Sequence, residues 1–189
     1  MEQQQDKIIV EQVLRGDHQA FARLIRSTEA LVATIIYKMI RSPADRKDIA
    51  QDVFIKVYNG LGTFRFQAKL STWIGQITYN TCLKYLKKQK LVLWNEDAVG
   101  AGAYNDPVAP GSASDLAEAR ELIEFLEKAV EKLPPVQQLL VTLYHRQELS
   151  YAEIMTITGL PEGTIKSFLY RARHQLKTSL LVNYNPADL

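Results

Sequence analysis

Residues 150–178 read SYAEIMTITGLPEGTIKSFLYRARHQLKT. Ser150 and Glu153 match a capping box, which predicts the start of a short helix, and Gly159 lies where a tight turn would end that helix. Pro161 suits the opening of a second helix. A short helix, a glycine-bearing turn and a second helix are the parts of a helix-turn-helix unit. The stretch therefore predicts a helical domain that can bind duplex DNA.

The second predicted helix has two unlike faces. At 100° per residue, one face is apolar and docks the helix; it contains Ile165, Leu169, Ala172 and Leu176. The opposite side is polar and mostly basic, with Lys166, Tyr170, Arg173, His174 and Lys177, flanked by Ser167 and Arg171. A solvated amphipathic helix in a bundle has the same periodicity, so the spacing alone leaves this alternative open. The turn and the lack of acidic residues between 162 and 188 favour DNA binding.

Upstream of this unit, the pattern predicts further helices and a break between them. A helix over 136–144 follows two prolines, and with a helix over 115–131 it completes a C-terminal domain, residues 116–182, followed by a tail, 183–189. Residues 94–115 contain Gly, Pro, Ala and Ser without apolar periodicity, which predicts a flexible linker. Residues 1–93 again show helical spacing. The predicted fold is all-α, with two small helical domains joined by a flexible linker.

Charge is distributed unevenly over these segments. The 189 residues carry a formal net charge of +2, but residues 1–93 hold 15 basic and 8 acidic groups, and the linker holds 4 acidic and no basic ones. Six basic residues and no acidic one lie between 65 and 90. A second acid-free basic stretch is the DNA-binding helix. Two separate cationic stretches indicate two contacts with one polyanion.

Residues 70–88 predict a helix with Ser71 at its cap. One stripe of this helix combines an aromatic residue, two amides and two lysines: Trp73, Gln76, Asn80, Lys84 and Lys87. Such a stripe suits DNA that is opening, because bases stack on aromatic rings and lysines hold the backbone. The alternative for Trp73 is a half-buried core position, which the residue by itself favours.

The sequence offers little support for an enzyme. The single cysteine, Cys82, falls on the apolar face of its helix, and His18, His145 and His174 are scattered. We therefore expect no catalytic residue, no metal site and no cofactor. The polar N-terminus and the lack of a long apolar run predict a soluble cytoplasmic protein without membrane insertion.

The string from Leu149 to Arg173, with its GLPEGTIKS segment, resembles region 4 of bacterial sigma factors. In that family the second helix of the unit reads the −35 promoter element in the major groove. The resemblance implies that Phe168 replaces a usual arginine, so that a contact is lost there or becomes an apolar contact to a thymine methyl. It places these residues at the −35 DNA: Thr164, Lys166, Ser167, Tyr170, Arg171 and Arg173.

Residues 45–58 (DRKDIAQDVFIKVY) and 64–88 resemble region 2 of the same family. The resemblance implies that the 45–58 helix grips the clamp of the largest RNA polymerase subunit, that the loop at 64–71 receives a base extruded from the −10 element, and that Asn80 contacts a −10 base. The implied polymerase contacts are Asp48, Gln51, Asp52, Phe54 and Lys56. The implied −10 contacts are Phe64, Lys69, Ser71, Trp73, Gln76, Asn80, Lys84 and Lys87.

The chain has only a linker where primary sigma factors carry a middle domain, so it resembles the extracytoplasmic-function (ECF) group. This resemblance implies core RNA polymerase (clamp and flap), promoter DNA and an anti-sigma factor as partners, and a linker that threads a basic channel of the polymerase. One rival remains: a stand-alone regulator that binds duplex DNA through its helix-turn-helix and dimerises through its N-terminal half. Residues 45–88 argue against it, since such a regulator needs neither a clamp-binding face nor a strand-opening stripe.

Overall fold

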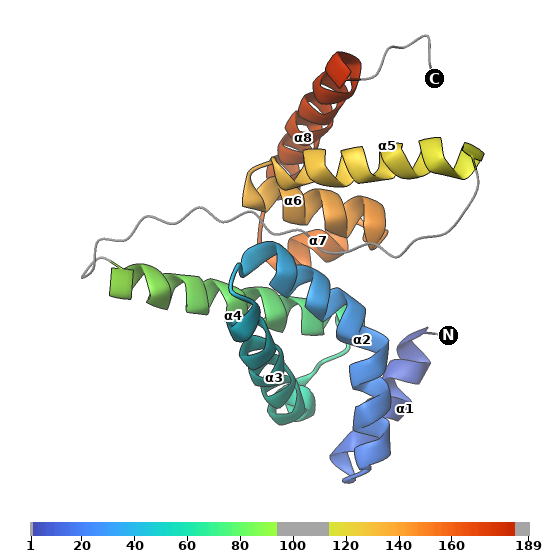
Figure 1. The fold of residues 1–189 in the computed structure, drawn as a ribbon. Coiled ribbons are helices and arrows are strands. Elements are labelled where there is room, and N and C mark those ends of the chain that lie inside the picture. Colours follow the sequence, from blue (N-terminus) through green and yellow to red (C-terminus); the bar gives the residue numbers. More distant parts are fainter. Residues whose placement is uncertain (1, 94–113, 184–189) are drawn as a thin grey trace.

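The computed structural model describes residues 2–93 and 114–183, and within these ranges the protein contains helices and no strands, as the sequence predicts (Figure 1). Most of the predicted linker, and all of the predicted tail except Asn183, lie outside the described residues, so both stay predictions. The last two linker residues begin a helix. The elements are α1 Glu2–Leu14, α2 His18–Met39, α3 Pro43–Gly60, η1 Leu61–Thr63, α4 Leu70–Leu93, α5 Ser114–Glu131, α6 Pro135–Val141, η2 Thr142–Arg146, α7 Tyr151–Thr158 and α8 Glu162–Asn183.

Local capping chemistry fixes several helix ends. The Asp17 carboxylate accepts hydrogen bonds from the backbone N–H groups of Gln19, at 2.8 Å, and Ala20, at 3.0 Å, and so caps α2. The predicted capping box of α7 is present, with Ser150 and Glu153 each bonding the other's backbone N–H. Gly159 ends α7 in the left-handed conformation, at φ 71°, which glycine adopts without strain.

The prediction that Ser71 caps α4 is wrong. The helix begins one residue earlier, at Leu70, whose backbone N–H donates to the Asp6 carboxylate of α1 at 2.9 Å. A carboxylate near the first turn of a helix satisfies an orphan N–H and complements the helix dipole. Because Asp6 and Leu70 are 64 residues apart, local sequence pattern could not reveal this cap.

The first hydrophobic core lies within the N-terminal half. Helices α1 to α4 and the short η1 turn all contribute to it, so the core brings together residues from 10 to 82. Its members include Val10, Val13, Leu24, Val32, Ile36, Ile49, Val53, Val57, Leu61, Leu70, Ile74 and Cys82.

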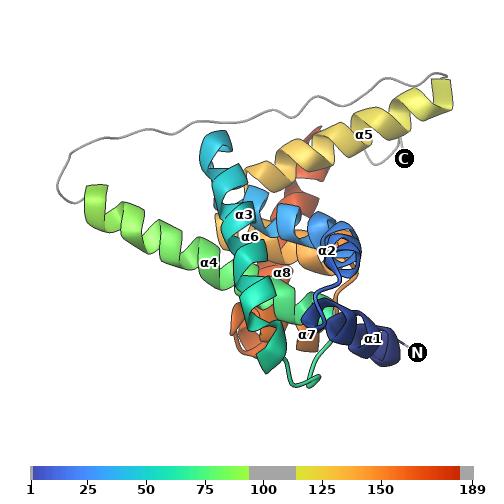
Figure 2. The same cartoon turned by 90° about the horizontal axis from the view of Figure 1, so that it is seen from below.

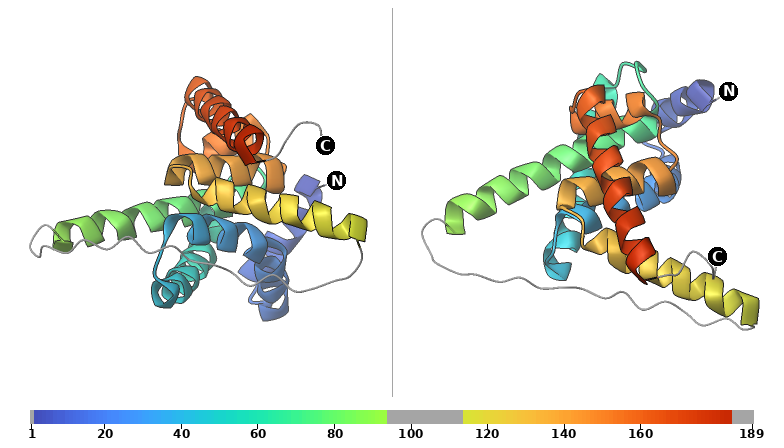
Figure 3. Two further views of the ribbon diagram at one scale, coloured as in Figure 1. Left: turned by 45° about the horizontal axis from the view of Figure 1, so that its top comes forward. Right: turned by 90° about the horizontal axis from the view of Figure 1, so that it is seen from above.

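The second core joins the two halves of the chain. Leu31 and Ile35 of α2 and Tyr79 of α4 pack with the apolar faces of the C-terminal helices. Helices α6 and α7 lie against α2 and α4, and this arrangement can be followed in three views (Figures 1, 2 and 3). The C-terminal members are Leu133, Leu139, Leu140, Val141, Leu143, Ile154, Ile157, Ile165, Leu169 and Ala172.

The junction between α4 and α7 is close. A Cβ atom added to Gly75 of α4 would lie 3.0 Å from two side-chain carbons of Ile157, so only glycine lets the helices approach this closely. Polar contacts flank the apolar ones. Lys69 forms an ion pair with Glu153 at 3.2 Å, and the Gln147 amide donates to the Thr34 hydroxyl at 3.2 Å.

Candidate nucleic-acid interface

The α8 helix presents the two faces that its sequence predicts. Ile165, Leu169 and Ala172 are fully buried against the C-terminal core. Thr164 is half-buried, and the other predicted −35 contacts are exposed: Lys166, Ser167, Tyr170, Arg171 and Arg173. Tyr170 is 66% exposed, a large value for an aromatic side chain. This face therefore offers cations, a hydroxyl and a ring to a groove of DNA.

Lys166, near the N-terminal end of this face, already contacts other side chains of the protein. Its ammonium group lies 2.7 Å from the Glu162 carboxylate and 5.4 Å from the centre of the Tyr151 ring. The hydrogen bond and the charge of Glu162 raise the pKa of Lys166 above its ordinary value. Tyr151 in turn stacks on Tyr144, with ring centroids 5.1 Å apart. Lys166 would have to give up the Glu162 contact to bind a phosphate or a base edge.

Phe168 does not project freely from α8. It is half-buried and packs against the C-terminal core, and the Arg171 guanidinium lies over its ring at 5.0 Å. The predicted apolar contact to a thymine methyl is therefore less accessible than the sequence suggests, because part of the ring is already covered.

The predicted −10 stripe divides into an exposed and a covered part. Asn80, Lys84 and Lys87 are exposed along α4, and Gln76 is half-buried. Trp73 is half-buried in the N-terminal core, 5.1 Å from the Phe64 ring between centroids, and its indole lies 3.3 Å from the position of a Cβ on Gly60. The alternative interpretation of Trp73, a half-buried core position, thus describes its packing in the structure. Asn80 and the lysines remain free to meet DNA.

The loop that precedes α4 is held in an unusual conformation. Phe66 has φ 56°, in the left-handed region that a bulky residue rarely occupies, and such strain often marks functional loops. The Phe64 and Phe66 rings pack at 4.7 Å, and the Lys7 ammonium lies 5.8 Å from the Phe66 centroid. Phe64 itself is buried, so it supports the loop rather than presenting its ring to solvent.

A groove of about 370 Å³ lies beside this loop, between α1 and α2. The predicted −10 residues Lys69 and Ser71 form one side of it. Its other walls come from helices that sequence reasoning did not connect with the site. The complete lining is Gln5, Asp6, Ile9, Arg23, Leu24, Ser27, Thr28, Lys69, Leu70 and Ser71.

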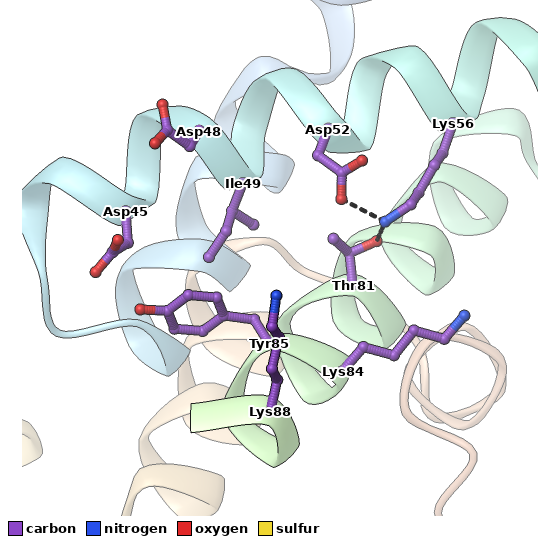
Figure 4. Close-up of a pocket in the computed structure, with 9 residues that line it drawn as sticks. All are labelled: Asp45, Asp48, Ile49, Asp52, Lys56, Thr81, Lys84, Tyr85 and Lys88. Carbon is purple, nitrogen blue, oxygen red and sulfur yellow. Dashed lines mark hydrogen bonds and ion pairs between the residues drawn. The ribbon is translucent and has the colours of Figure 1, made fainter. Parts of the chain in front are cut away.

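A second hollow of about 350 Å³ lies between α3 and α4 (Figure 4). Asp45, Asp48 and Asp52 of α3 line it on one side, and Lys84 and Lys88 of α4 line it on the other. Hydrogen bonds from Ser42 and then Tyr85 lower the pKa of Asp45. The hollow therefore has an acidic wall and a basic wall, which suits a polar protein partner.

Most of the predicted polymerase contacts lie on or beside the acidic wall. Asp48, Gln51 and Asp52 are exposed, and Lys56 pairs with Asp52 and donates to the Thr81 hydroxyl at 3.3 Å. Phe54 is half-buried against the N-terminal core.

Two family descriptions match the chain, "Sigma-70 region 2" over residues 24–92 and "Sigma-70, region 4" over residues 124–176. The ECF RNA polymerase sigma-E factor of Escherichia coli K12 is 32% identical over 180 residues, which cover 93% of this chain and 94% of that protein. The chain belongs to the ECF sigma factors. The resemblance inferred from the sequence is thereby confirmed.

Further relatives of this sigma factor agree with that assignment. The ECF RNA polymerase sigma factor SigW of Bacillus subtilis is 30% identical over 176 residues, 90% of this chain and 94% of that protein. The sigma factor RpoE of Bartonella quintana, solved in complex with the anti-sigma factor NepR, has a TM-score of 0.70 at 22% identity, covering 86% and 97% of the two chains. CnrH in complex with the cytosolic domain of CnrY has a TM-score of 0.62 at 18% identity, covering 95% and 98%. These structures support the fold.

Some contacts of this sigma factor lie outside the region 2 match. Asp6, which caps α4, and Lys7, which lies over Phe66, precede residue 24. No periodicity or motif in the sequence marks either residue, because their partners are tertiary.

Cys82 of the sigma factor is fully buried, and burial raises the pKa of its thiol to about 12. A buried neutral thiol is a poor nucleophile, in agreement with the structural role predicted for it. Within the described ranges, no three His, Cys, Asp or Glu side chains are grouped to hold a metal ion. In the same ranges, no helix combines the length and apolar character that crossing a bilayer requires.

Proposed function

We propose that this sigma factor binds core RNA polymerase and directs promoter-specific transcription initiation, reading the −35 element as duplex and the −10 element as opened strand. One observation carries the proposal: the chain presents two separate DNA-compatible faces, on α8 and on α4, in a protein whose relatives are named sigma factors. It is proposed to act as an initiation factor and not as an enzyme. Because it would act on RNA polymerase, it is proposed to work in the cytoplasm.

The −35 element is assigned to α8. Lys166, Ser167, Tyr170, Arg171 and Arg173 are exposed on one side of this helix, and the buried side anchors it to the C-terminal core. A side chain that bonds two atoms of one base edge contributes about 1–3 kcal/mol of discrimination. The remaining cations would hold phosphates and fix the register of the helix.

The −10 element is assigned to α4 and the loop before it. Asn80 offers both a donor and an acceptor to a base edge, and Lys84 and Lys87 follow on exposed turns of the same helix. The groove beside Lys69 and Ser71 is large enough for an unstacked base. Extruding a base costs a few kcal/mol, which contacts in such a groove can offset.

Protein partners are assigned to two surfaces. The polar side of α3, with Asp48, Gln51, Asp52, Phe54 and Lys56, would meet the clamp of the largest polymerase subunit, and the C-terminal domain would meet the flap. Two proteins of similar fold were solved in complexes, and one of them is named as a sigma factor bound to an anti-sigma factor. We therefore expect an anti-sigma partner for this chain as well.

The decisive experiment mixes the purified chain with bacterial core RNA polymerase, tests for a complex by gel filtration, and then assays transcripts from genomic fragments. Co-elution together with promoter-dependent transcripts is expected. Tight duplex binding without a polymerase complex would contradict the proposal and favour a stand-alone regulator.

Strand opening is tested with Asn80→Ala in the reconstituted holoenzyme. Permanganate reactivity of thymines around the −10 element is expected to fall, while polymerase binding stays unchanged, because Asn80 is exposed and no described contact in the fold depends on it. Asn59→Ala is the matched control, since Asn59 is also an exposed helical asparagine. Equal footprints for Asn80→Ala and the unmodified protein would rule out the assigned role.

A further inference from the structure

Phe168 links the DNA-facing side of α8 to the C-terminal core. Its ring is half-buried and packs against the cluster that contains Ile165 and Leu169. Part of the ring is therefore held by packing, while the rest borders the exposed face. An aromatic residue fixed in this way can serve as a platform for a neighbouring side chain.

Arg171 occupies that platform. Its guanidinium carbon lies 5.0 Å from the centre of the Phe168 ring, within the range of a cation–π contact. One guanidinium N–H donates to the Ser167 hydroxyl at 3.1 Å, and Nε–H donates to the Ser167 carbonyl at 3.4 Å. Two neighbours on one helix thus restrain the guanidinium from two directions.

Arg171 also differs from Lys166 in its electrostatics. Lys166 is paired with a carboxylate, Glu162, at 2.7 Å, whereas in the described parts of the chain no ion pair involves Arg171. An aromatic face and a hydroxyl orient a guanidinium without cancelling its charge. Arg171 can therefore meet DNA without first breaking an ion pair, and its restricted motion lowers the entropy lost on binding.

We propose that Phe168 is a positioning residue that orients Arg171 for a bidentate contact with a guanine of the −35 duplex. Arginine is suited to this base because its fork of donors matches the O6 and N7 acceptors of guanine. The inference rests on the proposed sigma function. It gives Phe168 a role in base selection that differs from the two expectations drawn from the sequence, a lost DNA contact or an apolar contact to a thymine methyl.

The test uses the full chain assembled with core polymerase and a promoter library with randomised −35 positions, from which bound DNA is selected and sequenced. Arg171→Ala is expected to lower the preference for one guanine about fivefold to a hundredfold, the range of a lost bidentate contact. Phe168→Leu keeps an apolar side chain against the core but removes the aromatic face. We expect it to lower preference for the same guanine about two- to fivefold and to leave other positions unchanged.

Two further variants separate positioning from packing. Phe168→Tyr keeps the aromatic face and is expected to retain the guanine preference. The double variant Phe168→Leu/Arg171→Ala is expected to match Arg171→Ala alone, because the ring acts only through the guanidinium. Thermal unfolding of each variant shows whether the fold is retained.

Three outcomes would overturn the inference. Guanine preference unchanged in Phe168→Leu would remove the positioning role, as would a uniform loss at every −35 position or additive effects in the double variant. If the unmodified protein selects promoters normally in any of these cases, the sigma function stands. If the unmodified protein forms no polymerase complex and selects no −35 sequence, the sigma function fails and this inference fails with it.

Discussion

The two hydrophobic cores of this sigma factor are built differently. Within the described residues, the first draws all its members from the N-terminal half, whereas the second completes the C-terminal domain with Leu31, Ile35 and Tyr79 from the N-terminal helices. The N-terminal half therefore contains the residues of its own core, while the C-terminal half rests on a surface that α2 and α4 supply. The difference indicates that damage should spread from the first core to the second more readily than in reverse.

Truncation within each core gives the largest expected effect and tests this asymmetry. Ile74→Ala and Ile165→Ala each remove a fully buried side chain, and each should lower the free energy of unfolding by about 2–5 kcal/mol. Hydrogen exchange should show that Ile74→Ala lowers amide protection in both halves, and Ile165→Ala mainly in α6 to α8. Ile55→Ala is the control, at 59% exposure. If both variants lowered amide protection equally in both halves, neither half would depend on the other more strongly than the reverse.

Enlarging Gly75 should separate the halves without disturbing the first core. Gly75→Leu places side-chain atoms where Ile157 already lies, so we expect a loss of about 1–3 kcal/mol and an increased radius of gyration in small-angle X-ray scattering. Labelling of the buried Cys82 thiol should stay slow, because Cys82 belongs to the first core. Gly163→Leu is the matched control, since nothing lies within 4 Å of its Cβ position. Rapid Cys82 labelling in Gly75→Leu would mean that the cores are not separable.

Holding the halves together should block promoter use. In the proposed function, α8 and the loop before α4 read the −35 and −10 elements, which lie about 25 base pairs apart, on the order of 80 Å along B-form DNA. In the structure, however, Lys69 of that loop contacts Glu153 of α7 at 3.2 Å. Joining Lys69→Cys to Glu153→Cys with a short, reducible thiol crosslinker should lower promoter-dependent transcription at least tenfold. Reduction of the linker should restore it, and each single variant treated alike is the control. Full activity of the crosslinked chain would show that the closed arrangement can already read both elements.

A smaller effect is expected from pH at the same junction. Burial opposes ionisation of Glu153, but the Ser150 hydroxyl, the Ser150 backbone N–H and Lys69 outweigh it and hold the pKa of Glu153 below its ordinary value. A lowered folded-state pKa stabilises the fold above the unfolded value, near 4.5, and this stability is lost as pH falls through the folded value. Glutamine can keep the capping bonds with Ser150 but loses the charge that faces Lys69, so Glu153→Gln should remove up to about 1 kcal/mol at pH 7, the size of a partly exposed ion pair, and less at pH 3. Urea unfolding at the two pH values measures the difference, with Glu148→Gln as the exposed control. An equal loss at both pH values would exclude the ionic contribution.

Sequence periodicity predicted many helix faces and helix ends of this protein, because it reflects contacts between residues three or four positions apart. The opposite faces of α8, the capping box at Ser150, the left-handed turn at Gly159 and the burial of Cys82 all depend on such spacing. The buried and exposed faces of α8 were therefore predicted well, since one helix carries both, while the −35 contacts assigned to the exposed face stay predictions. The exposed stripe of α4 was predicted less completely: Asn80 and the lysines are exposed, as the pattern indicates, but the pattern could not decide how far Trp73 turns into the core.

Other features had no local signal. Phe66 adopts the left-handed region in a loop where the Phe64 ring and the Lys7 ammonium lie against its ring, and Asp6 caps α4 from 64 residues away. The π-helical turn Thr142–Arg146 also departs from the simple helix predicted over 136–144. Each depends on which elements meet in space.

The amino-acid sequence by itself determined the helices, their apolar stripes and the two basic faces, because backbone hydrogen bonds and side-chain periodicity within a helix are local. Only the tertiary structure decided that α7 packs on α4 through Gly75 and Ile157, that Phe168 lies beneath Arg171 while anchored in the core, and that one core serves both halves of the chain. The periodicity of apolar residues indicates which face of a helix is buried. The shape and packing of the facing side chains decide against which partner it is buried.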